Sequence, residues 1–153
     1  MNLKKIKVKD IMTEIIISIP QDAAIKDAAH LMLRDRISGL LVIDNKKKIV
    51  GVITLTDFLK IIDRIATGGS DDFLENLLHC RTLKVADVMT RKVHSLPPEA
   101  KLEEAVRIMV DKNIHTFPVM KNKRLLGVIG RRDIINAVFY FSEAVKEKSS
   151  LKR

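Results

Sequence analysis

The stretch "GVITLTD" at residues 51–57 returns as "GVIGRRD" at residues 127–133. This duplication decides how the rest of the chain is interpreted. A second pair of segments repeats as well: "VKDIMT" at 8–13 returns as "VADVMT" at 85–90, with nearly the same spacing between the copies. A register that is held across most of the chain predicts an internal repeat, because chance does not preserve the order and spacing of several motifs.

Both copies have the same local pattern. "SIP" at 18–20 and "SLP" at 95–97 each precede a segment whose apolar residues recur at spacings of three and four, which is typical of a helix face. A short apolar strand, a lysine-rich turn, a second strand and a second helix follow. We therefore predict an α/β (α+β) fold of two pseudo-symmetric units, each about β-α-β-β-α, packed through their sheets around a cleft lined twice by the same residue types. The predicted first-helix faces are Ile25, Ala28, Ala29 and Met32, and Leu102, Ala105, Val106 and Met109.

The repeat also predicts the domain boundaries. We predict that residues 1–66 form the first unit and residues 84–145 the second. The two units should pack together, because a single unit of this size buries too little surface to be stable alone. Residues 67–83 have no counterpart inside a unit and are expected to be a linker with a short helix, which either covers the core or forms a dimer contact. Residues 146–153 are expected to be a disordered basic tail.

The composition limits the classes of function. The sequence has 153 residues and contains no Gly-x-x-x-x-Gly-Lys loop, which is the signature of P-loop ATP hydrolysis. Its four histidines are scattered and Cys80 is its one cysteine, so we expect no metal site, no disulfide and no nucleophilic centre. We therefore predict that the protein is not an enzyme. No apolar run approaches the roughly 20 residues of a membrane span, and we expect a soluble, cytoplasmic protein without a membrane partner.

The repeated motifs, taken in order, resemble a tandem pair of cystathionine β-synthase (CBS) domains, also called a Bateman module. The resemblance covers about residues 8–66 and 84–140. It implies a stand-alone regulatory module, commonly a homodimer, that binds an adenosine-containing ligand such as AMP, ADP, ATP or S-adenosylmethionine and uses no catalytic cofactor. Ligand binding would shift a conformational equilibrium and act on a separate, unidentified effector protein.

The resemblance also implies site residues. In the family's "GhhTxxD" motif the hydroxyl residue lies near phosphate and the aspartate on ribose hydroxyls. These positions are Thr54 and Asp57 in the first copy, and Gly130 and Asp133 in the second. Because the second copy lacks the hydroxyl, we expect unequal sites, with phosphate contacts there from backbone amides, the neighbouring arginines or a histidine similar to that of the "IHxxPV" segment in the AMP-activated protein kinase γ subunit. The other implied contacts are Thr13, Ile19, Pro20, Ser38, Gly39, Leu40, Thr90, Leu96, Pro97, His115, Thr116, Phe117, Arg131 and Arg132.

Two alternatives remain open at this point. Thr54, Asp57 and Asp133 each stand where they would cap a helix, so capping alone explains them equally well. The formal net charge of +9 also fits a nucleic-acid-binding module, which would show steeply salt-dependent retention of DNA or RNA.

Overall fold

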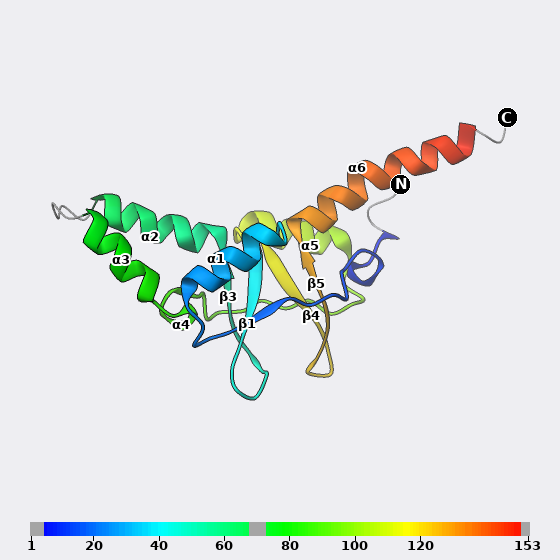
Figure 1. Ribbon diagram of the computed structural model, residues 1–153. Coiled ribbons are helices and arrows are strands. Elements are labelled where there is room, and N and C mark those ends of the chain that lie inside the picture. The colour runs from blue at the N-terminus through cyan, green and yellow to red at the C-terminus, as the bar shows by residue number, and fades with distance from the viewer. Residues whose placement is uncertain (1–4, 68–72, 151–153) are drawn as a thin grey trace. The chain divides into compact units, whose positions relative to one another are not determined.

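The computed structural model describes residues 5–67 and 73–150, and for residues 73 and 141–150 the backbone only. Its helices and strands form two compact units (Figure 1). The α1–α2 unit spans Ile17–Val93 and is named for its helices α1 (Ile25–Arg34) and α2 (Leu55–Thr67). The α5–α6 unit combines Met1–Ile16 with His94–Arg153 and is named for α5 (Leu102–Asp111) and α6 (Arg131–Ser150).

The α1–α2 unit contains a three-stranded sheet with the order β1-β2-β3. The first pair is parallel and the second antiparallel, so α1 makes the crossover and a tight turn joins the last two strands. The remaining elements of this unit are β1 (Ser18–Pro20), β2 (Gly39–Ile43), β3 (Ile49–Thr54), α3 (Phe73–Thr82) and α4 (Val85–Val88). The predicted β-α-β-β-α order is confirmed.

The α5–α6 unit follows the same order with one reduction. Its antiparallel strands β4 (Thr116–Lys121) and β5 (Arg124–Gly130) form the sheet, and a 3-10 helix, η2 (Val8–Asp10), lies in the same unit. The counterpart of β1 is a single parallel bridge between Leu96 and Val119. Pro97 and Pro98 follow that bridge, and because proline has no N–H they cannot extend the ladder as donors.

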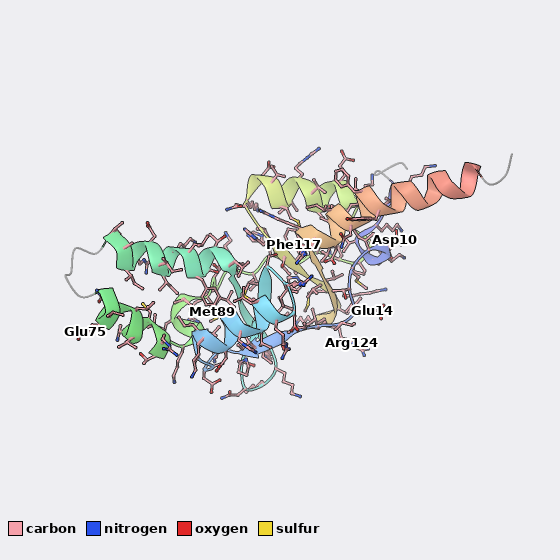
Figure 2. The ribbon with its side chains drawn as sticks, turned by 45° about the horizontal axis from the view of Figure 1, so that its top comes forward. Asp10, Glu14, Glu75, Met89, Phe117 and Arg124 are labelled. Carbon is pink, nitrogen blue, oxygen red and sulfur yellow. The ribbon has the colours of Figure 1, made fainter. Side chains whose placement is uncertain are left out.

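The core of each unit lies between its helices and its sheet. Ala28 and Met32 of α1 are buried against alternating strand residues such as Leu40, and their counterparts Ala105 and Met109 of α5 are buried in the same cluster as Phe117. Figure 2 labels Phe117 and Met89, which belong to the two separate clusters. The predicted helix faces are therefore correct at these positions. Val106 is the exception, since 38% of its surface is exposed.

The segment 8–13 does not pack with the repeat that follows it. Val8 is fully buried in the core of the α5–α6 unit, and its N–H donates to the Ala100 carbonyl at 2.9 Å. Thr13 and Val128 of β5 exchange two backbone hydrogen bonds, each 2.9 Å long. This segment is thus part of the unit that contains the second repeat.

The segment 85–90 shows the reciprocal arrangement. The Val85 N–H donates to the Ala23 carbonyl at 2.8 Å, and Thr90 exchanges two 2.9 Å hydrogen bonds with Val52 of β3. The compact units are not the two repeats themselves, because each "VxDhMT" segment completes the unit built from the other repeat. The boundaries 1–66 and 84–145 remain a prediction about the repeats. The fully buried valine of each segment, Val8 or Val85, fills the same core position in the unit built from the other repeat.

The predicted linker and tail are both more helical than expected. Within 67–83, α3 packs against α1 and α2, while residues 68–72 lie outside the described residues. Helix α6 continues to Ser150, so most of the segment 146–153 expected to be disordered has a helical backbone. The sequence of its last turns, "EAVKEK", consists mainly of good helix formers. Among the residues that the structure describes, no helix is long and apolar enough to cross a membrane.

Candidate functional site

The Thr54 corner is the junction of β3 and α2, together with Gly39 of the neighbouring strand. Asp57 stands in the first turn of α2, and its Oδ2 accepts two hydrogen bonds, from Thr54 N–H at 2.8 Å and from Thr54 Oγ1 at 3.0 Å. Its other oxygen lies 3.6 Å from Lys60 Nζ, and the aspartate is 94% buried, with a residual exposure of 6%. Sheet pairing places Gly39 opposite Thr54. The carboxylate is thus held in one orientation by the residue that ends the strand.

The Gly130 corner is the equivalent junction of β5 and α6, together with Thr116 of the neighbouring strand. Asp133 Oδ2 accepts a 2.6 Å hydrogen bond from Gly130 N–H, the counterpart of the Thr54 bond. Sheet pairing places Thr116 opposite Gly130. A Cβ built on Gly130 would lie 3.4 Å from Asp133 Oδ2 and 3.6 Å from Thr116 Oγ1. The aspartate, the threonine hydroxyl and the strand end therefore meet at one point.

The surroundings of Asp133 change how readily its carboxyl ionises. Burial raises the pKa of the Asp133 carboxyl above its ordinary value, and the Gly130 hydrogen bond and the positive charge of Arg132 oppose that rise. A ligand hydroxyl that needs the ionised carboxylate as acceptor would consequently lose it at a higher pH than at an ordinary aspartate. The resolved shift also indicates that Arg132 carries its charge close to this corner.

Helix capping is a common role of aspartate in this molecule. Asp10 accepts from Lys7 N–H and Asp87 accepts from Lys84 N–H, each at 2.8 Å, at the starts of η2 and α4. These are the same contacts, three residues apart, that Asp57 and Asp133 make. Capping is thus established for all four residues, and it does not exclude ligand binding by the two at the corners.

Arg131 has a different surrounding from the one expected for a phosphate ligand. Its Nε donates to the Ile114 carbonyl at 3.0 Å, and its terminal nitrogen donates to Asn113 Oδ1 at 2.9 Å and to the Met109 carbonyl at 3.4 Å. These acceptors lie at the end of α5 and just after it, where unpaired carbonyls attract a cation. The guanidinium is therefore directed at α5, and Arg132 is the arginine that lies near the carboxylate.

The remaining predicted contacts divide between the two units. Thr90 lies in the α1–α2 unit and Thr13 in the α5–α6 unit, so the sequence-based grouping of these two residues with their own repeats is reversed by the segment exchange. Leu40 and Phe117 have no exposed surface and are core residues in this conformation. The other contacts lie in β1, at the entrance to β2 or beside the equivalent strands: Ile19, Pro20 and Ser38 in one unit, Leu96, Pro97 and His115 in the other.

Neither corner carries a metal-ligand cluster. No group of three or more His, Cys, Asp or Glu side chains with the required proximity occurs among the residues with described side chains. The chemistry that the corners do offer consists of paired acceptors and donors: a capped carboxylate, a threonine hydroxyl and the first N–H groups of a helix of more than eight residues. Such a set can accept hydrogen bonds from hydroxyl groups and donate them to phosphate oxygens.

The sequence matches the CBS domain family over residues 8–64 and again over residues 85–140. The chain belongs to the CBS domain family. The two matches together cover nearly the whole 153-residue sequence as a CBS pair.

Two relatives of similar length support the assignment. The chain is 31% identical to the uncharacterized protein MJ1426 of Methanocaldococcus jannaschii, with 86% of this chain and 90% of that protein covered. It is 27% identical in sequence to an acetoin utilization protein, AcuB, from Vibrio cholerae. The crystal structure of that protein gives a TM-score of 0.71, with 93% of this chain and 96% of that chain covered. Enzymes match only in part: the chain is 30% identical to an inosine-5′-monophosphate dehydrogenase of Methanocaldococcus jannaschii over 95% of this chain but 26% of that enzyme.

Two solved CBS structures contain adenosine compounds. CBSX2, in complex with AMP, has a TM-score of 0.68 at 22% identity, with 89% of this chain and 98% of that chain covered. The CBS domain pair of MJ0100, in complex with 5′-methylthioadenosine and S-adenosyl-L-methionine, has a TM-score of 0.69 at 24% identity, with coverage of 87% and 95%. These likenesses establish a shared fold.

Proposed function

We propose that this CBS pair is a regulatory module that senses an adenosine-containing ligand and acts on a separate protein, without catalysing a reaction. The observation that carries the proposal is the pair of capped corners, where Asp57 and Asp133 stand in fixed orientation beside a threonine hydroxyl and a helix N-terminus. A carboxylate can accept from both hydroxyls of a ribose, and a hydroxyl with helix N–H groups suits a phosphate. The AMP and S-adenosylmethionine complexes of CBS structures with the same fold support this ligand class.

The proposal is tested by a ligand panel on the full chain. Because a ligand that binds only the folded state raises its stability, AMP, ADP, ATP and S-adenosylmethionine should raise the unfolding temperature in proportion to their affinities. Isothermal titration calorimetry then gives the affinity and the number of sites. Binding weaker than about millimolar for every member, about 4 kcal/mol, would sink the proposal.

Four aspartate variants separate ligand binding from capping. Asp57→Ala and Asp133→Ala should each lower the stability and also abolish or weaken one adenosine site. Asp10→Ala and Asp87→Ala are matched controls, since these residues make the same cap hydrogen bond away from the corners. They should lower stability while leaving ligand affinity unchanged. Equal ligand affinity in all four variants would return Asp57 and Asp133 to a purely structural role.

We also propose that a second copy of the chain covers the groove between α5 and α6. This groove has a volume of about 440 Å³, and the apolar residues Val110 and Ile135 are 74% and 54% exposed there. The proposed homodimer predicts that the double variant V110E/I135E has a monomer's mass in sedimentation equilibrium. A wild-type chain that is already monomeric at high concentration would contradict it.

A further inference from the structure

The threonine hydroxyl has changed strands between the two units. In the α1–α2 unit the paired positions at the corner are Gly39 on β2 and Thr54 on β3. In the α5–α6 unit they are Thr116 on β4 and Gly130 on β5. Each corner therefore has one glycine and one threonine opposite each other, in reversed positions. The second repeat has not lost the hydroxyl that its "GVIGRRD" motif lacks, because Thr116 supplies one from the adjacent strand.

The two hydroxyls differ in what they are bonded to. Thr54 Oγ1 donates its proton to Asp57 Oδ2 at 3.0 Å. A hydroxyl has one proton to donate, so in this state Thr54 can offer a ligand oxygen only its lone pairs. Thr116 Oγ1 has no hydrogen-bond partner among the residues whose side chains are described. The Thr116 proton is thus available to an anionic acceptor at the Gly130 corner.

The two corners also differ in the cation beside the aspartate. At the Thr54 corner, Lys60 Nζ pairs with Asp57 Oδ1 at 3.6 Å, and at the Gly130 corner Arg132 acts on the Asp133 carboxyl. The first turn of α6 begins with Arg131 and Arg132, where the first turn of α2 has Leu55 and Thr56. Arg132 is exposed and its positive charge lowers the pKa of the Asp133 carboxyl, whereas Arg131 is directed at α5.

We infer that the Gly130 corner is the half of the pair that takes a phosphate-bearing adenosine ligand, with Thr116 as its hydroxyl donor, whereas the Thr54 corner gives a phosphate little advantage. The inference rests on the proposed function, since it assigns a ligand class to one of the proposed sites. The sequence predicts two unequal sites and leaves open which half of the pair the ligand favours, and the inference assigns the phosphate to the second repeat.

The chain contains its own probes for this inference. Gly39 and Gly130 lie at the two corners, and glycine amide signals fall in a sparsely populated region of a ¹H–¹⁵N NMR spectrum. In a titration of the wild-type chain with AMP, the Gly130 signal should shift at several-fold lower concentration than the Gly39 signal. With adenosine, which lacks the phosphate, the difference between the two glycines should disappear.

Variants at the threonines provide a second measurement. Thr116→Val keeps the shape and removes the hydroxyl, so it should weaken AMP binding at the Gly130 corner about ten-fold, the usual scale for a hydrogen bond to a charged group. Its adenosine affinity should not change, and Thr116→Ser should retain AMP binding. Thr54→Val is the matched control and should leave AMP binding at the Gly130 corner unchanged.

Three outcomes would overturn the inference. A Gly39 signal that responds to AMP before Gly130 assigns the phosphate to the other unit, and an unchanged AMP affinity in Thr116→Val removes the role of that hydroxyl. If Thr116→Val does not fold, the order of the two wild-type glycine signals still decides. Absence of any shift with either AMP or adenosine is distinguishable from these results, because it would sink the proposed function itself and the inference with it.

Discussion

The two units have matching interiors and different outer surfaces. In the α1–α2 unit, α3 lies over the groove between the two helices, where Leu77 and Cys80 help to enclose a space of about 150 Å³. In the α5–α6 unit the described residues leave the corresponding groove open, with about 440 Å³ between α5 and α6. The duplication has thus preserved what each repeat needs in order to fold, while the surfaces and corners have diverged. Substitutions at equivalent positions of the two units should therefore have similar effects in the cores and different effects at the surfaces and corners.

The largest effect is expected in the matching cores. Phe117→Ala should lower the free energy of unfolding by about 3–5 kcal/mol, and its counterpart Leu40→Ala by about 2–5 kcal/mol, because both side chains are fully buried and leave cavities. Urea unfolding measures both. Leu33→Ala is the control, since Leu33 is 71% exposed and its loss should cost less than about 0.5 kcal/mol. A core variant that resembled this control would show that the two interiors are not equivalent.

The next effect distinguishes how tightly the exchanged segments are held. A Cβ on Gly127 would lie 2.6 Å from the backbone oxygen of Thr13. A Cβ on Gly51 would lie 3.0 Å from the backbone oxygen of Thr90, and its 2.6 Å contact is with the flexible Met89 Sδ. Because a methionine side chain can move and a paired strand cannot, Gly127→Ala should cost about 2–3 kcal/mol and Gly51→Ala about 1 kcal/mol. Thermal unfolding of the two variants gives the order. Equal losses of stability in the two variants would mean that both segments are packed equally tightly.

A smaller difference is expected between the two capping aspartates. Asp57→Ala removes the acceptor of two hydrogen bonds and should lower stability by about 1–2 kcal/mol. Asp133→Ala removes one bond from a carboxyl whose ionised form is already disfavoured, and should cost about 1 kcal/mol or less. Chemical unfolding near neutral pH tests the comparison. The asparagine variants should lie between wild type and alanine, since the amide oxygen still accepts. A larger loss at Asp133 would contradict the environments described above.

The smallest effect concerns the exposed ion pairs of Glu99 in the α5–α6 unit. Lys7 and Lys9 hydrogen-bond Glu99 and lower its pKa from the usual 4.5 to about 2. A lowered folded-state pKa makes the stabilising contribution complete above pH 4.5, and it is lost as the pH falls from there toward 2. Glu99→Gln should therefore lower the unfolding temperature slightly at pH 6 and not at the acid end of this range. Asp22→Asn, at the equivalent position of the first repeat, is the control and should leave the unfolding temperature unchanged across the same pH range. A Glu99→Gln deficit independent of pH would rule out the ion pair as its cause.

The sequence predicts well what local pattern and repetition determine. The buried faces of α1 and α5, the strand pairs and the capped aspartates follow from residue spacing and from the known preferences of helix starts. It does not predict which unit receives Val8 or Val85, because both repeats offer the same motif and only tertiary packing distinguishes them. The hydroxyl of Thr116 is missed for a related reason. Its partnership with Gly130 comes from strand register, which joins residues that no single motif contains.

The exchanged segments have a consequence for how this chain can be divided. A fragment that contains only one repeat would keep a "VxDhMT" segment but lack the unit into which that segment packs. The core of the fragment would also lack its buried valine, which comes from the other segment. Two such fragments could satisfy each other by trading these segments, which is the arrangement of a domain-swapped dimer. In its connectivity, the tandem pair is such a dimer with its two chains joined end to end. Its covalent linkage keeps the two partners at a fixed one-to-one ratio, independent of protein concentration.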